Sequence, residues 1–162
     1  METSTLILGI SPGTRFLGLA VLKDREVVHS YLKAFKGKWN AKKENNIREW
    51  LRKQISQYED VVVAMKKLNP SYAQAQQLSV ISMIEQIAKE DNLPIYSYSN
   101  KDLKQHFCHS TRADPKLLMK AVVEITQDFM IEYQRELKNS SGYYIKFFEA
   151  IALTLLHSAK SY

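Results

Sequence analysis

Apolar residues in the first part of the chain gather in short runs that are separated by turn-forming residues. The runs 6–10 and 16–22 flank a turn over 11–15 that holds proline and glycine, a pattern typical of two buried strands in an antiparallel hairpin. A third strand is predicted over 26–32, where apolar and polar positions nearly alternate. The β-branched run 61–65 is too short for a helix and predicts a central strand parallel to the first.

Farther along the chain, apolar residues recur every three or four positions, which predicts amphipathic helices. The first helix is expected over 40–58. The second is expected over 69–89, where Asn69 would cap the helix and Pro70 would occupy its first position. A short strand is predicted over 93–98. Three more helices are expected over the ranges 100–107, 114–137 and 143–159.

The order of the predicted elements is three strands, a helix, a strand, a helix, a strand and then helices. This order predicts an α/β fold with a mixed five-stranded sheet flanked by helices. Ser99 and Asp114 are the expected N-caps of the helices that follow them. The last helix is apolar over most of its girth, so we expect it to lie across the sheet. Because the sequence has no repeat, linker or low-complexity tract, residues 1–162 are predicted to form one domain.

Composition adds limits on the class of protein. Hydrophobic residues make up 45% and charged residues 25% of the 162 residues, as in globular proteins. No apolar run approaches the length of a membrane helix, and the N-terminus does not resemble a signal peptide, so we expect a cytoplasmic protein. A single cysteine, Cys108, excludes an internal disulfide and a cysteine zinc cluster.

The net charge of +6 permits a polyanionic partner. Basic residues are concentrated over 33–43, where Phe35 and Trp39 are interleaved with them. Two interpretations of this segment stay open at the level of the sequence. It is either a solvated loop or a patch that grips a nucleic-acid backbone.

Five segments, in order along the chain, resemble the motifs of the RuvC-type Holliday junction resolvases, within the ribonuclease H-like superfamily. The segments that carry the resemblance are 8–18, 60–65, 98–105, 113–116 and 146–153. Together they span nearly the whole chain, and the resemblance implies a ribonuclease H-like fold. It also implies a chemistry, in which four carboxylates hold two Mg²⁺ ions that hydrolyse a phosphodiester.

The four positions that match those carboxylates hold Ser11, Met65, Lys146 and Glu149. Glu149 is the only acid retained, and the four side chains carry no net charge. Lys146 lies three residues before Glu149 on a predicted helix, so we expect the two to form an ion pair. We therefore predict that the site has lost two-metal catalysis and needs no cofactor.

The resemblance also implies contacts with DNA. The residues at positions expected to bind nucleic acid are Arg15, Lys66, Lys67, Tyr72, Lys104, Arg112 and Lys116. Tyr72 follows the second motif, where the family inserts an aromatic residue into the junction. Homodimer formation is expected through the helix 69–89. The prediction is a protein that binds branched or duplex DNA, four-way junctions included, without cleaving it.

Two alternatives stay open from the sequence. The first is an active Holliday junction endonuclease that uses Mg²⁺ at a displaced site, built from Asp60, Asp102 or Asp114. The second is a protein-interaction module that retains only the fold. DNA binding, metal-dependent cleavage and a co-purifying protein partner are the observations that separate the three.

Overall fold

The computed structural model describes residues 6–69, 71, 73–139 and 142–161. The strands are β1 (Leu6–Ser11), β2 (Phe16–Lys23), β3 (Glu26–Ala34), β4 (Val61–Lys66) and β5 (Ile95–Tyr98). The helices are α1 (Ala41–Ile55), α2 (Ala75–Glu90), α3 (Asn100–Cys108), α4 (Pro115–Ile125), α5 (Met130–Asn139) and α6 (Ile145–Ser161), with a 3-10 turn over Gln127–Phe129. Over the described residues, no helix is long and apolar enough to cross a membrane.

The five strands form one sheet in the order β3-β2-β1-β4-β5. β1, β2 and β3 pair antiparallel, whereas β4 runs parallel to both β1 and β5. The predicted mixed five-stranded sheet is therefore confirmed, including the parallel pairing of the first and fourth strands. β3 extends to Ala34, two residues beyond the predicted end of that strand.

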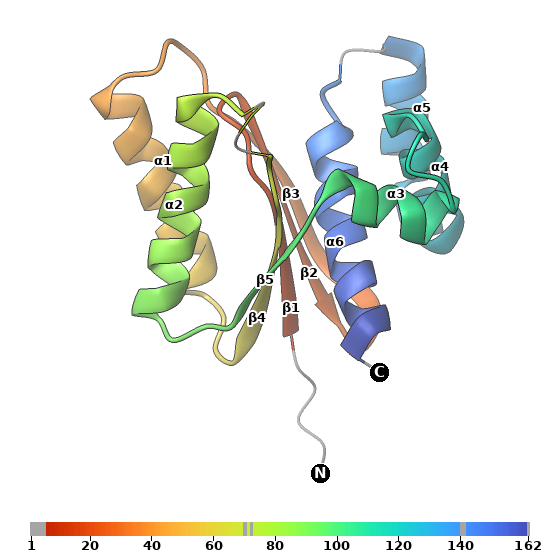
Figure 1. The fold of residues 1–162 in the computed structure, drawn as a ribbon, viewed down its shortest axis with the longest axis horizontal. Coiled ribbons are helices and arrows are strands. Elements are labelled where there is room, and N and C mark those ends of the chain that lie inside the picture. The colour runs from red at the N-terminus through yellow and green to blue at the C-terminus, as the bar shows by residue number, and fades with distance from the viewer. Residues whose placement is uncertain (1–5, 70, 72, 140–141, 162) are drawn as a thin grey trace.

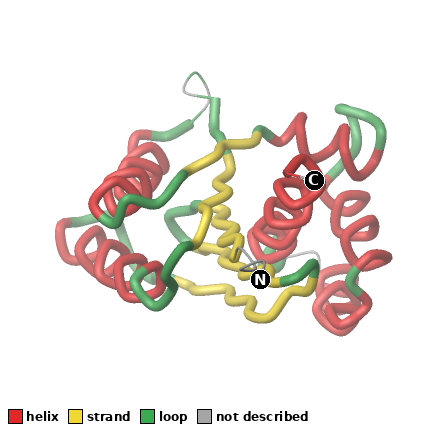
Figure 2. The backbone as a smooth tube through the Cα atoms, turned by 90° about the horizontal axis from the view of Figure 1, so that it is seen from below, coloured by secondary structure: helices red, strands yellow, loops and turns green. Residues whose placement is uncertain are grey.

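Helices cover both faces of the sheet (Figure 1). α1 and α2 lie on one face, where residues such as Leu51 and Ile84 pack on the leucines and isoleucines of β1 and β2. α6 crosses the other face, as predicted, and α3, α4 and α5 pack outside it. Viewed along the sheet, the strands separate the two helical layers (Figure 2). Each layer buries its own apolar cluster, because successive side chains of a strand point to opposite faces.

Two glycines set how closely α6 approaches the sheet. A Cβ atom on Gly9 would overlap the carbonyl oxygen of Ala150, and one on Gly18 would overlap the carbonyl oxygen of Lys146. Only a residue without a side chain fits either position. The N-terminal turns of α6 are thus held against the ends of β1 and β2, which fixes where their side chains project.

The predicted start of the second helix was wrong. α2 begins at Ala75, not at Asn69, and Pro70 lies outside the described residues. The Asn69 side-chain oxygen accepts a hydrogen bond from the Ser71 backbone N–H at 2.9 Å, which makes a local turn. Asparagine offers this alternative to helix capping, because its short side chain reaches the backbone two residues ahead.

The predicted helix over 114–137 is in fact two helices. Thr126 leaves the helical conformation, with φ −123° and ψ 79°, and its hydroxyl donates to the carbonyl of Val122 at 2.9 Å. β-branched residues at 122, 123, 125 and 126 lower the helix propensity at this point, and the threonine hydroxyl competes for the backbone. α4 therefore ends at Ile125, and α5 starts after the 3-10 turn.

Asp114 is the N-cap of α4, as the sequence predicted. The Asp114 carboxylate accepts a hydrogen bond from the Leu117 backbone N–H at 3.0 Å. Asp114→Ala should lower the free energy of unfolding by about 1 kcal/mol, measured by urea denaturation, because it removes this acceptor. Asp114→Asn preserves the acceptor and should leave stability nearly unchanged. Equal losses in the two variants would contradict the capping role.

Candidate functional site

The carboxyl-terminal ends of two parallel strands meet the first turns of α6. Ser11 is the last residue of β1 and Lys66 is the last residue of β4. Lys146 and Glu149 lie on the first turns of α6, which the close approach at Gly18 presses against β2. Four polar side chains are thereby gathered at one edge of the sheet.

The Glu149 carboxylate is at the centre of this group and is buried. One of its oxygens, Oε2, forms an ion pair with Lys66. The other, Oε1, lies 3.7 Å from the Lys146 ammonium and accepts a hydrogen bond from the Ser11 hydroxyl at 3.4 Å. The predicted pairing of Lys146 with Glu149 is present, and Lys66 adds a second ammonium to it. A lone carboxylate is therefore shared by two lysines.

Met65 does not join this group, contrary to the sequence-based expectation. Its side chain is buried in the core under α1 and α2, on the opposite face of the sheet. Adjacent strand residues point to opposite faces, so the side chain that projects toward α6 is that of Lys66. The signal was present in the pattern, because Val61, Val63 and Met65 alternate along one apolar face of β4.

Lys66 itself was expected to contact nucleic acid. The structure instead buries it, with 5% of its surface exposed, in the ion pair with Glu149. With Lys66 in place of Met65, the group of Ser11, Lys66, Lys146 and Glu149 carries one net positive charge rather than none.

A pocket of about 160 Å³ opens beside this group. Its polar lining consists of Lys66, Lys146 and Glu149, together with Asn100 and Lys104 of α3. Ser99 caps α3, accepting from the Asp102 backbone N–H at 3.1 Å, which confirms the predicted N-cap and fixes this helix beside the pocket. With three ammonium groups and one carboxylate, the pocket favours an anion.

Burial lowers the pKa of the Lys146 ammonium, and the adjacent Lys66 lowers it further, whereas Glu149 opposes the shift. Between the lowered pKa and the ordinary lysine value, the unfolded chain binds the proton that the folded protein has released. Stability must therefore rise with pH in that interval. Below that pH interval, Lys146 is charged in both the folded and the unfolded protein, and the folded protein bears the whole cost of burying the ammonium.

This linkage gives a measurable prediction. The free energy of unfolding of the wild type, relative to Lys146→Met, should rise with pH across the interval by about 1.4 kcal/mol for each unit by which the pKa is lowered. Urea denaturation at several alkaline pH values measures it. Lys138→Met, on the exposed side of α5, should show no such pH dependence. A flat difference for Lys146→Met would contradict the shifted pKa.

The remaining residues that were expected to bind nucleic acid lie outside the pocket or at its border. Arg15 is exposed in the turn between β1 and β2, and Lys67 is exposed directly after β4. Arg112 and Lys116 are exposed around the start of α4, whose Pro115 lines the pocket. Tyr72 lies outside the described residues.

The three aspartates of the displaced-site alternative do not come together. Asp102 accepts a hydrogen bond from the Ser99 backbone N–H at 2.8 Å, and Asp114 caps α4. Asp60 precedes β4, at the end of the strand opposite Lys66. In the part of the chain that the structure describes, no three side chains of His, Cys, Asp or Glu are placed to hold a metal ion.

Comparison with solved structures identifies the fold. RuvC of Thermus thermophilus matches with a TM-score of 0.71 and 18% identity, over 97% of this chain and 95% of that chain. T. thermophilus RuvC in complex with a Holliday junction substrate matches with a TM-score of 0.70 and 18% identity, over 97% and 94% of the two chains. No family model and no curated protein matches the sequence. The chain thus has the RuvC-like, ribonuclease H-like fold that its sequence predicted.

Proposed function

We propose that this protein binds branched or duplex DNA and does not cleave it. The observation that carries the proposal is the Glu149 carboxylate, which two lysines and a serine hydroxyl already occupy. Because the Glu149 carboxylate is already paired, these side chains offer positive charge to a ligand and no free carboxylate oxygens to a metal ion. An anionic backbone is the matching partner.

The side chains present do not fit a pair of Mg²⁺ ions. Mg²⁺ prefers carboxylate oxygens, and two such ions about 4 Å apart need several of them to offset their repulsion. Here Lys66 and Lys146 stand within ion-pair distance of Glu149. A metal ion would have to displace both ammonium groups and then face their charge. We therefore derive no metal-dependent step and propose that the site is degenerate as a nuclease.

The proposal for DNA rests on charge and on fold. The chain carries a net charge of +6, and the pocket has more ammonium groups than carboxylates. A solved structure of the same fold, T. thermophilus RuvC, is in complex with a Holliday junction substrate. We propose that Lys104 and Lys146 contact one backbone phosphate, while Arg15, Lys67, Arg112 and Lys116 contact others. Phosphate contacts position a duplex without reading its sequence.

Binding of a four-way junction and of a matched duplex, measured at rising salt, tests this function. The logarithm of the binding constant should fall linearly with the logarithm of the salt concentration. Lys104→Ala should weaken binding to all sequences alike. The slope of the logarithm of the binding constant against the logarithm of the salt concentration should become shallower by about 1. Lys138→Ala, on the exposed side of α5, is the matched control and should change neither. Failure of the wild type to bind either DNA at low salt would overturn the proposal.

We also propose that two copies pair through α2. Gln76 and Ser79, three residues apart on this helix, are uncharged and only half-buried. Sedimentation should show a dimer for the wild type and a monomer for Ser79→Glu, because the charge would be buried in the interface. A monomeric wild type at the concentrations used for DNA binding would contradict this pairing.

A further inference from the structure

A second basic surface lies at the same edge of the sheet as the pocket. It is a groove of about 830 Å³ between the β1–β2 turn, the segment 35–40 that joins β3 to α1, the start of α2, and Tyr143 before α6. Its basic side chains are Arg15, Lys36 and Lys43. Four aromatic rings line it from three separate segments: Phe16, Phe35, Trp39 and Tyr143. None of its described lining residues is acidic.

The positive charge continues around the segment 35–40. A neighbouring hollow of about 600 Å³ shares Lys36 and Lys43 with the groove. It adds Lys33, Lys38, Lys42 and Lys53, against a single acid, Glu49. Among the residues with described positions, no carboxylate pairs with Lys36, Lys38 or Lys42.

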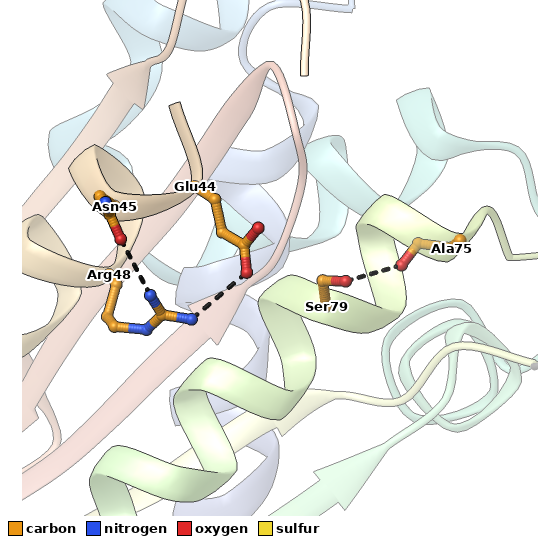
Figure 3. A network of polar contacts seen from close by, with 5 residues as sticks. All are labelled: Glu44, Asn45, Arg48, Ala75 and Ser79. Atoms are coloured by element: carbon orange, nitrogen blue, oxygen red, sulfur yellow. Dashed lines mark hydrogen bonds and ion pairs between the residues drawn. The ribbon is translucent and has the colours of Figure 1, made fainter. Parts of the chain in front are cut away.

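A nearby acid on α1 is already neutralised. Glu44 pairs with Arg48 at 3.3 Å, and the same guanidinium contacts Asn45 at 3.1 Å (Figure 3). The cationic side chains along the segment therefore keep a strong surplus of charge. Such a surplus attracts anionic partners.

The segment 35–40 is fixed to the body of the protein. The Phe35 backbone N–H donates to the carbonyl of Arg15 at 2.9 Å, which joins the segment to the β1–β2 turn. The Lys43 ammonium donates to the carbonyl of Gly37 at 2.8 Å, and Gly37 has a positive φ of 91° that favours glycine. Trp39 is thereby held at the groove on a defined backbone.

The groove and the pocket are adjacent. The Lys146 Cε atom lies 3.4 Å from where a Cβ on Gly13, in the β1–β2 turn, would be. Tyr143, just before α6, meets Phe16 edge to face, with ring centroids 5.0 Å apart. A backbone that leaves the pocket past Lys146 would reach this pair of rings next.

We propose that this groove binds an unpaired, single-stranded segment of DNA, with its bases stacked on Trp39 and Tyr143 and its phosphates facing Arg15, Lys36 and Lys43. Aromatic rings in a basic groove are the usual platform for unpaired bases, whose ring faces are open. In a duplex those faces are already stacked on one another. The inference rests on the proposed function for the identity of the partner, and it adds a preference for an unpaired strand next to the pocket.

The test uses an oligothymidylate of about 12 nucleotides, a length within the range that single-strand sites cover. Trp39→Ala should weaken its binding by about five- to a hundredfold, the effect of losing one stacked base. Trp39→Phe retains a ring and should recover most of the affinity. Tyr96→Ala removes a 49% exposed ring on β5, outside the groove, and is the matched control.

Fluorescence gives a direct readout of stacking. The chain has two tryptophans, so Trp50→Phe leaves Trp39 as the sole reporter. Its emission should be quenched when the oligothymidylate binds. Lys36→Glu, an exposed change in the same segment, should also weaken binding and needs no loss of a packed ring.

The outcomes separate this inference from the proposed function. If the wild type binds a four-way junction, but neither Trp39→Ala nor Lys36→Glu alters oligothymidylate binding, the inference is overturned and the proposed function stands. Unchanged Trp39 emission on binding has the same meaning. If the wild type binds no DNA, both are overturned. Loss of affinity in both variants, with quenching, supports the inference.

Discussion

Glu149→Ala should lower the free energy of unfolding by about 3–5 kcal/mol, the loss expected when one partner of a buried ion pair is removed. Lys66 is 5% exposed and would be left without its carboxylate, close to the ammonium of Lys146. Lys66 would stay buried with its charge uncompensated, because Gly9 and Gly18 hold α6 against the sheet. Urea denaturation at neutral pH measures the loss.

Two variants show whether this loss comes from the stranded charge. Glu90→Ala removes the carboxylate of an exposed ion pair with Arg52, 2.9 Å long, and should cost less than about 1 kcal/mol. The double variant Lys66→Met, Glu149→Gln removes both buried charges and should recover most of the stability lost in Glu149→Ala. A loss in Glu149→Ala no larger than in Glu90→Ala would refute the buried network.

The second large effect is a gain of metal binding. Ser11→Asp, Lys66→Glu and Lys146→Asp, combined in one variant, would surround Glu149 with three further carboxylates. We expect the variant to bind Mn²⁺ or Mg²⁺ with a dissociation constant below about 1 mM, as sites rich in carboxylate oxygens do. At a metal concentration 100 times that constant, binding should stabilise the fold by about 2.7 kcal/mol.

Thermal unfolding with and without Mn²⁺, together with calorimetric titration, measures this gain. Without metal, the clustered carboxylates repel one another, so the variant should be less stable than the wild type. The matched control keeps Lys66 and Lys146 and changes only Ser11→Asp, which should bind Mn²⁺ no better than the wild type. Equal Mn²⁺ affinity in the wild type and the triple variant would contradict the reading of the site as degenerate.

The five strands and the parallel pairing of β1 with β4 could be predicted because local periodicity and tertiary structure agree there. β1, β2 and β4 are buried apolar runs between turn residues, and Ser99 and Asp114 cap the helices that follow them. The prediction failed where one residue type supports two local structures. Asn69 makes a turn where it was expected to cap a helix, and Thr126 bonds back to Val122 and ends a helix that periodicity alone would continue.

Three of the four residues of the site could be predicted, but the residue that β4 contributes could not. Ser11, Lys146 and Glu149 meet as the sequence indicated, yet the strand residue beside them is Lys66. Motif matching placed Met65 there because it ignored which side of β4 each residue faces. The basic segment 33–43 with its aromatic residues was identified in the sequence, but the groove was not, because it forms only when the pairing of β2 with β3 brings Phe35 beside Arg15.

Incubation of the wild type with a labelled four-way junction, in Mg²⁺, in Mn²⁺ and in a chelator, distinguishes a protein that only binds DNA from a metal-dependent nuclease. Binding and strand cleavage are followed in the same samples. We predict an intact junction in all three conditions, because Lys66 and Lys146 occupy the carboxylate that a metal would need. Divalent ions should weaken binding only as other added cations do, by competing for the DNA phosphates. Metal-dependent cleavage that disappears in Glu149→Ala would contradict the proposed function.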